Sequence, residues 1–157
     1  MNSKLNNLNL NPLNYCLPTH HAIADSGCTG IYIPETTPCI NKISTHPSNA
    51  VQVHVPNGAT MHSTHTATLP IPTLPPQAGK AHVFNDLKSG PLLSIGQLCD
   101  FGCSVLFTLT QMLVFNKNLQ HIVTGTRNQN TGLWYAPFQF QILLNRQINH
   151  FLSQFLN

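Results

Sequence analysis

The chain has 157 residues, and Lys, Arg, Asp and Glu together make up only 7% of it, against about 25% in an average soluble protein. The basic residues are scattered and the net charge is +3, which argues against a nucleic-acid-binding stripe. A hydrophobic content of 41% is enough for one domain with a core. Its surface, covered mainly by uncharged polar side chains, is expected to self-associate readily.

The first twenty residues are rich in Asn and lack the apolar core of a signal peptide. We interpret residues 1–20 as a flexible leader. There is no run of about 18 apolar residues that would predict a membrane span. Five cysteines without a framework spacing are typical of free thiols in a reducing compartment. The sequence therefore predicts a cytoplasmic protein with no membrane partner.

The first predicted strand ends near Ala24 and leads into a tight turn that contains Gly27 and Gly30. A second strand is predicted after this turn because the residues there are apolar and β-branched. It stops at Pro34. Residues 35–49, rich in Pro, Thr and Asn, are expected to form a loop.

A plain alternation of apolar and polar residues begins at Val51 and continues through Val53 and Val55. It meets Asn57-Gly58, a strong hairpin signal in which both turn residues would adopt positive φ. Residues 51–71 are therefore predicted to form one long β-hairpin with a mobile tip. Four prolines between residues 70 and 76 end it, because proline cannot donate to a ladder.

A short helix is predicted from Ile95 to Phe101, since Ser94 suits its N-cap and Gly102 suits the position after its end. The other expected elements are a strand at 81–84, a strand ending at Leu92-Leu93, a strand at 105–107, a hairpin at 112–125 and a loop at 125–137 that carries the only tryptophan. Five apolar residues share one helical face of the tail: Leu144, Ile148, Phe151, Leu152 and Phe155. A C-terminal helix at 142–156 is therefore expected to pack on the domain or on a second copy.

Only four carboxylates occur in the chain: Asp25, Glu35, Asp86 and Asp100. Asp25 alone lies on a turn between two apolar strands, followed by the hydroxyl of Ser26 and by Gly27. A buried Asp needs a partner, and two-fold symmetry would supply the Asp25 of a second copy. Two such carboxylates share one proton, so that one activates a water and the other polarises a carbonyl group.

These features resemble the retropepsins, and in detail the aspartic protease segment of copia-type retrotransposon polyproteins. The resemblance covers roughly residues 20–137. It rests on three motifs in order: Asp25-Ser26-Gly27, Val55-Pro56-Asn57-Gly58 and Leu92-Leu93-Ser94-Ile95-Gly96-Gln97-Leu98. Residues 99–107 are also similar to the helix-Gly-Cys-strand passage that ends retroviral proteases, and 125–127 and 132–135 resemble the stretch that leads towards an integrase. The chain departs from retroviral proteases at Ser94, where they usually have glycine, and at Cys28, a position often filled by alanine.

The resemblance implies an all-β fold: a closed barrel with a flap hairpin and one short helix. It divides the chain into the leader, a protease domain at 21–110, a trailing hairpin and loop at 111–137, and a tail at 138–157. The implied function is a homodimeric aspartic endopeptidase that cleaves a polyprotein, with no metal or cofactor. The catalytic residues would be Asp25, Ser26 and Gly27, and an extended peptide would contact Val55, Asn57, Gly58, Ala59, Leu92 and Leu93. The alternative is an inactive remnant of the same fold that only dimerises or binds peptides.

Two other kinds of site were weighed from the same residues. The close Cys and His pairs lack the ligand spacing of a structural zinc site. A Cys-His nucleophile would use Cys28 as the attacking thiol, with His54 or His82 beside it. Nothing in the sequence marks either histidine for that role.

Overall fold

The computed structural model of this chain describes residues 20–55 and 57–138. The predicted C-terminal helix at 142–156 and nearly all of the predicted leader lie outside these residues. His20, which was assigned to the leader, already belongs to the first strand.

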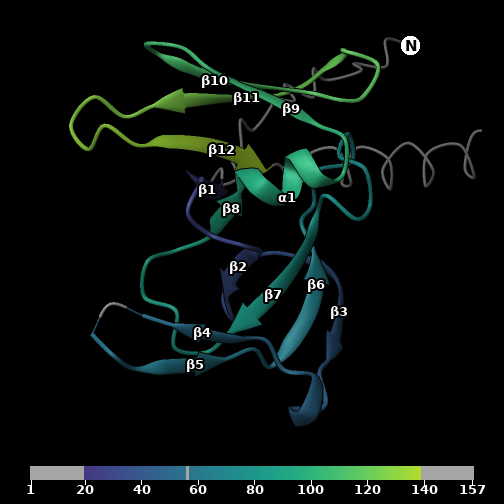
Figure 1. The fold of residues 1–157 in the computed structure, drawn as a ribbon, viewed down its shortest axis with the longest axis vertical. Coiled ribbons are helices and arrows are strands. Elements are labelled where there is room, and N and C mark those ends of the chain that lie inside the picture. Colours follow the sequence, from purple (N-terminus) through teal and green to yellow (C-terminus); the bar gives the residue numbers. More distant parts are fainter. Residues whose placement is uncertain (1–19, 56, 139–157) are drawn as a thin grey trace, which may run out of the picture.

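Strands are the main regular structure of the described residues, and there is one short α-helix (Figure 1). The elements are β1 (His20–Asp25), β2 (Ile31–Pro34), β3 (Ile40–Ser44), the 3-10 helix η1 (Pro47–Asn49), β4 (Gln52–His54), β5 (Thr60–His62), β6 (His65–Thr68), β7 (Lys80–Phe84), β8 (Leu92–Ser94), α1 (Ile95–Asp100), β9 (Ser104–Phe107), β10 (Gln111–Phe115), β11 (His121–Arg127) and β12 (Trp134–Phe138). The prediction of a β protein with one short helix is confirmed.

Ten of these strands form one sheet in the order β3-β6-β7-β2-β8-β1-β12-β11-β10-β9. The two end strands, β3 and β9, each have one neighbour in that order, so hydrogen bonding among the described strands does not close a barrel. The expected closed barrel is not seen, because β9 to β12 extend the sheet beyond β1 instead of joining it to β3. Sheet hydrogen bonds also cross the division expected at residue 110, since β12 pairs with β1.

Strand β8 lies between the first two strands of the chain. It runs parallel to β1, with Ile23 opposite Leu92 and Asp25 opposite Ser94, and antiparallel to β2. The segment that connects β1 to β2 folds back as a turn because Gly27 and Gly30 interrupt the apolar pattern. The insertion of β8 brings the helix that follows it directly beside this turn.

Helix α1 begins where its capping residues predict. The side chain of Ser94 accepts a hydrogen bond from the Gln97 N–H, and Gly102 adopts a φ of 84° just past the C-cap. The helix spans six residues, and the described part of the chain has no helix long and apolar enough to cross a membrane.

Three local predictions are wrong. The segment 35–49 contains β3 and η1, because Ile40 and Ile43 pair with β6 and gain backbone partners that a free loop would lack. The long hairpin at 51–71 is divided: β4 and β5 form a separate two-stranded sheet, while β6 joins the main sheet between β3 and β7. Trp134 begins β12 and does not lie in a loop, because the stretch pairs with β1 and β11.

One hydrophobic core runs through the described residues and draws on both sides of the expected boundary at 110. Ile31, Val83 and Leu93 contribute from the strands around β2, and Met112 and Phe138 contribute from the later strands. Residues before 110 supply most of this core, and the strands after 110 complete it.

Candidate functional site

Asp25 is the last residue of β1 and is partly buried. Its Oδ1 accepts a hydrogen bond of 2.7 Å from the backbone N–H of Gly27. A Cβ atom at Gly27 would lie only 3.3 Å from this oxygen, so the absence of a side chain there allows the turn to wrap closely around the carboxylate. Ser26 and Gly27 are exposed, and the turn therefore faces solvent.

The side chain of Ser94 holds this turn in place from the interior of the protein. The side chain is fully buried, and its Oγ donates a hydrogen bond of 2.6 Å to the Cys28 carbonyl while accepting one of 3.0 Å from the Gln97 N–H. One hydroxyl thus joins the Asp25 turn, β8 and the start of α1. The sequence predicted only its capping role, because Cys28 lies 66 residues away and no local pattern reports such a contact.

Gln97 adds a second link that sequence reasoning did not assign. Its Oε1 accepts a hydrogen bond of 3.1 Å from the Ile31 N–H, and its Nε2 donates one of 2.7 Å to the Lys80 carbonyl. The side chain therefore connects α1 to the first residues of β2 and β7. Together, the side chains of Ser94 and Gln97 connect the Asp25 turn, α1, β2 and β7 through hydrogen bonds.

The other three carboxylates are all exposed. Glu35 forms an ion pair with Lys42, which lowers the pKa of Glu35 through a hydrogen bond to its carboxylate. Asp86 follows β7, and Asp100 ends α1. Asp25 is therefore the only carboxylate of the chain that is both partly buried and held in a defined turn.

The predicted flap tip is a tight turn, although not of the predicted type. The Gly58 N–H donates to the Val55 carbonyl at 2.9 Å, the Val55 N–H donates to Ala59 at 3.0 Å, and Asn57 Oδ1 accepts from the Ala59 N–H at 3.0 Å. Gly58 has a φ of 82°, whereas Asn57 does not share a positive φ. The tip therefore has one left-handed residue, Gly58, in place of the two residues of positive φ that were predicted.

An open cavity of about 630 Å³ lies beside this tip. Val55, Asn57 and Ala59 line it together with Met61 and the segment Asp86–Ser89. The structure thus joins three of the predicted peptide-contacting residues to a segment that the sequence analysis treated only as polar and exposed. The sequence Asn85-Asp86-Leu87-Lys88 carries no motif that could have predicted the position of this segment beside the hairpin tip.

Leu92 and Leu93, which were both predicted to contact a peptide, differ in their exposure to solvent. Leu92 is partly exposed, whereas Leu93 is 1% exposed and belongs to the core. Leu93 therefore has no exposed surface for a peptide, because alternate residues of a strand face opposite sides, whereas peptide contact through Leu92 stays a prediction.

A second cavity, of about 530 Å³, lies on the other side of the same segment. It is lined by His21, Ile23, Ser89, Pro91 and Tyr135, among others. Ser89 borders both cavities, and Ile23 is two residues from Asp25. The segment from Asp86 to Pro91 therefore borders both cavities, the first beside the hairpin and the second beside β1.

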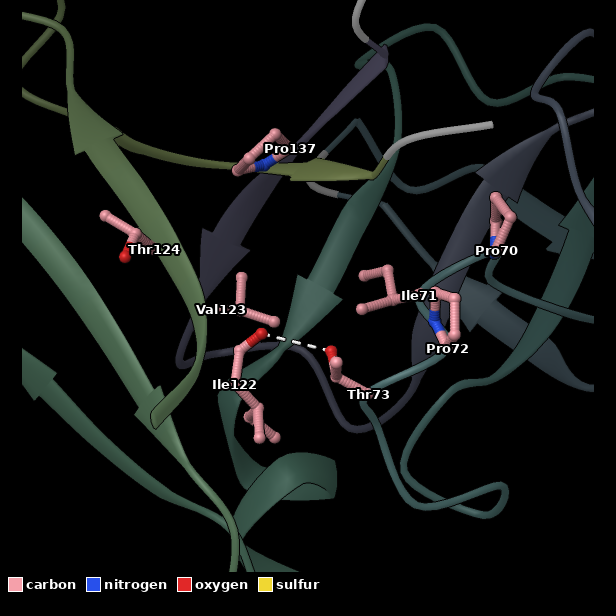
Figure 2. Close-up of a pocket in the computed structure, with 8 residues that line it drawn as sticks. All are labelled: Pro70, Ile71, Pro72, Thr73, Ile122, Val123, Thr124 and Pro137. Atoms are coloured by element: carbon pink, nitrogen blue, oxygen red, sulfur yellow. Dashed lines mark hydrogen bonds between the residues drawn. The ribbon is translucent and has the colours of Figure 1, made fainter. Parts of the chain in front are cut away.

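A third, smaller cavity of about 250 Å³ carries no acid-base chemistry (Figure 2). None of its lining residues is ionisable: Pro70, Ile71, Pro72, Thr73, Ile122, Val123, Thr124 and Pro137. Figure 2 shows the hydrogen bond that Thr73 Oγ1 donates to the Ile122 carbonyl, which is 3.0 Å long. This bond fastens the proline-rich connection to β11.

The Cys28 nucleophile is not supported by its surroundings. The thiol donates a hydrogen bond of 2.9 Å to the Gly30 carbonyl, and burial, followed by the nearby charge of Asp25, raises the pKa of Cys28. A raised pKa keeps the thiol protonated and unreactive. His54 bonds Thr60 instead of the thiol. Within the described ranges, no group of three or more His, Cys, Asp and Glu side chains could hold a metal ion.

No family model, curated protein or solved structure matches this chain. Its function is therefore inferred from the Asp25 turn, the hairpin and the cavities beside the hairpin and β1.

Proposed function

We propose that this chain is an aspartic endopeptidase that acts as a homodimer on an extended polypeptide. The observation that carries the proposal is the Asp25 turn: a solvent-facing Asp-Ser-Gly at the end of β1, with its carboxylate held by the Gly27 N–H and its backbone fastened to buried Ser94. A carboxylate held in this way has a defined orientation, which acid-base catalysis requires.

The second carboxylate would come from the Asp25 of another copy. Two carboxylates brought together at a two-fold axis cannot both ionise, so the pair shares one proton. The ionised member takes a proton from the attacking water, and the protonated member polarises the scissile carbonyl.

The substrate would lie between the hairpin and the segment Asp86–Pro91. The cavity beside Val55, Ala59 and Met61 is mainly apolar and open, which suits alternate side chains of an extended peptide. The separate β4–β5 sheet corresponds to the flap of the retropepsin-like fold that we propose, and the strand order β2-β8-β1 supports the same fold. The resemblance to copia-type proteases suggests a retrotransposon polyprotein as substrate.

The direct test is hydrolysis of an unfolded polypeptide between about pH 4 and 6, with and without a transition-state inhibitor of aspartic proteases. Asp25→Asn is expected to reduce turnover by at least about a thousandfold and to leave the fold intact, because the amide keeps the shape but cannot accept the proton. The matched control, Asp100→Asn, removes an exposed carboxylate at the end of α1 and should retain full activity.

The rate of the natural chain should be bell-shaped in pH with an acidic maximum, because the pair must hold one proton. An active Asp25→Asn variant, or activity that rises through neutral pH and is blocked by a thiol reagent, would contradict the proposal. A natural chain that binds peptides without cleaving them would instead be the inactive, peptide-binding remnant.

A further inference from the structure

We call the cavity lined by residues 70–73, residues 122–124 and Pro137 the proline cavity. Figure 2 shows the connection 70–73, which follows β6, on one side and residues 122–124 of β11 on the other, with Pro137 of β12 at one end. Ile71, Ile122 and Pro137 are only partly buried. Apolar surface around the cavity is therefore open to solvent in the described part of the chain.

The hydrogen-bonding side chains of the proline cavity are already engaged within the protein. Thr73 Oγ1 donates to the Ile122 carbonyl at 3.0 Å, and Thr124 Oγ1 pairs with His121 Nε2 at 2.8 Å. The remaining lining residues are proline, isoleucine and valine. The volume, about 250 Å³, is also below the roughly 300–1,000 Å³ of most small-molecule sites. A small polar ligand would therefore find no side chain to orient it, whereas apolar side chains would leave water by binding here.

The chain continues from this cavity into a segment whose sequence has a matching apolar face. Pro137 lines the cavity, and residues 139–157 follow Phe138, the last described residue. The apolar face of this segment consists of Leu144, Ile148, Phe151, Leu152 and Phe155. Neither this face nor the cavity lining contains an ionisable residue. Leu144, the first residue of the face, follows Phe138 by six positions, which span at most about 22 Å, so the segment can reach the cavity.

We propose that the apolar face of residues 142–156 docks in the proline cavity of the same chain. A short connection gives such an intramolecular contact an effective concentration on the order of millimolar, so a second copy at lower concentration competes poorly. Docking removes apolar surface of both the segment and the cavity from water. It would also hold the connection 70–73 against β11, in addition to the Thr73 hydrogen bond. Of the two packing partners expected from the sequence, the domain or a second copy, the proposal selects the domain.

The docking contact is separate from the surface that the proposed activity needs. No residue that lines the proline cavity also lines either of the two larger cavities. Docking therefore leaves the proposed peptide-binding surface open. The inference does not rest on the proposed function, and docking can be measured whether or not the protein hydrolyses peptides.

The test is photo-cross-linking within the full chain. The photoreactive amino acid p-benzoylphenylalanine, whose ketone inserts into nearby C–H bonds under near-ultraviolet light, replaces Phe151 in the middle of the apolar face. The matched control carries the same amino acid in place of Asn149, which lies about 200° around a helix from Phe151. The first variant is expected to form a cross-link to residues 70–73 or 122–124, located by peptide mass spectrometry, in a product with the mass of one chain. The control should not form this cross-link.

A second substitution tests the cavity side of the contact. Ile71→Asp, added to the variant with the photoreactive group at position 151, places a carboxylate in the partly buried lining. It should abolish the cross-link, because docking would then bury an unpaired charge. Ile43→Asp, at a position of β3 that is 65% exposed, is the control and should leave the cross-link unchanged. Circular dichroism identifies a variant that merely unfolds, and in that case the location of the cross-link from position 151 still decides.

Four outcomes would overturn the proposal. A cross-linked product with the mass of two chains would show that the segment docks on a second copy. A cross-link to described residues outside the proline cavity would place the segment elsewhere on the domain. The absence of any cross-link from position 151, or equal yields with and without a folded Ile71→Asp substitution, would show that the segment does not dock in this cavity.

Discussion

Ser94 joins three parts of the candidate site through a single hydroxyl group. It is fully buried, and both of its hydrogen-bond partners, the Cys28 carbonyl and the Gln97 N–H, belong to the backbone. Ser94→Ala would leave both groups without their partner inside the protein. We expect a loss of about 1–3 kcal/mol in the free energy of unfolding, measured by urea denaturation.

The same variant should also lower the turnover of peptides, because the Asp25 turn loses its support. Ser104→Ala, at an exposed position of β9, is the control and should change the unfolding free energy by less than about 0.5 kcal/mol. A fully stable Ser94→Ala variant would show that the hydroxyl does not fasten the turn.

His82 makes the stability of the protein depend on pH. Burial, with a smaller contribution from Lys80, lowers the pKa of His82 below its ordinary value, and its Nδ1 is buried without a partner. The unfolded chain therefore takes up a proton below about pH 6.5, where the folded protein resists it. Stability should be complete above this pH and should fall as the solution becomes more acidic.

His82→Gln is expected to flatten this decline, as measured by urea denaturation at several pH values from 7 to 5. The exposed His21 provides the control, since His21→Gln should keep the decline of the natural chain. If both variants behave like the natural protein, another group causes the dependence. Because the stability of the fold decreases below about pH 6.5, an acidic pH optimum for peptide hydrolysis would lie in the range where the fold is losing stability.

At the scale of elements, the β4–β5 hairpin is the least integrated part of the described chain. It forms its own two-stranded sheet and lies in the lower half of the view, away from β9 to β11 (Figure 1). Its tip depends on Gly58, whose φ is 82° and around which a Cβ atom would meet nothing within 4 Å. A side chain at this position therefore costs backbone strain and causes no steric clash.

Gly58→Val should disturb the tip by about 1–2 kcal/mol of local strain and reduce peptide turnover roughly tenfold. The melting temperature should change little, because the core lies elsewhere. Gly58→Asn is the matched control, since Asn adopts the left-handed conformation more readily. Equal loss of turnover in both variants would indicate that the tip requires glycine for another reason, and unfolding would show that the hairpin is structural.

At the scale of the whole molecule, the strands after residue 110 complete the sheet that holds Asp25. Strand β12 pairs with β1 over four residues, and Met112, Val114 and Phe138 are fully buried. A chain ending at residue 110 would expose both an edge of β1 and much of the core. It is expected to lose its cooperative thermal transition, measured by circular dichroism.

A chain ending at residue 138 keeps every described strand and is the control for this truncation. It should melt cooperatively. A chain ending at 110 that folded and melted cooperatively would show that the segment 21–110 is a domain by itself, as the motifs suggested.

Local sequence rules predicted what depends on neighbouring residues. Ser94 and Gly102 marked the two ends of α1 because capping acts within one helical turn, and the glycines after Asp25 marked its turn. The same rules failed for β3, for the division of the 51–71 segment and for Trp134. Thr, Pro and Asn in those segments are typical of loops, but pairing with distant strands outweighed that preference.

The sequence by itself determined that the chain is mainly β, that one short helix follows Ser94, and that Asp25 is its best candidate for carboxylate chemistry. These conclusions depend on periodicity, on caps and on a count of four acidic residues. Only the tertiary structure decided that β8 lies between β1 and β2, that β12 pairs with β1, and that β9 ends the sheet among the described strands. Each of these depends on which distant backbone groups satisfy one another's hydrogen bonds while apolar faces are buried together, and no window of neighbouring residues contains both partners.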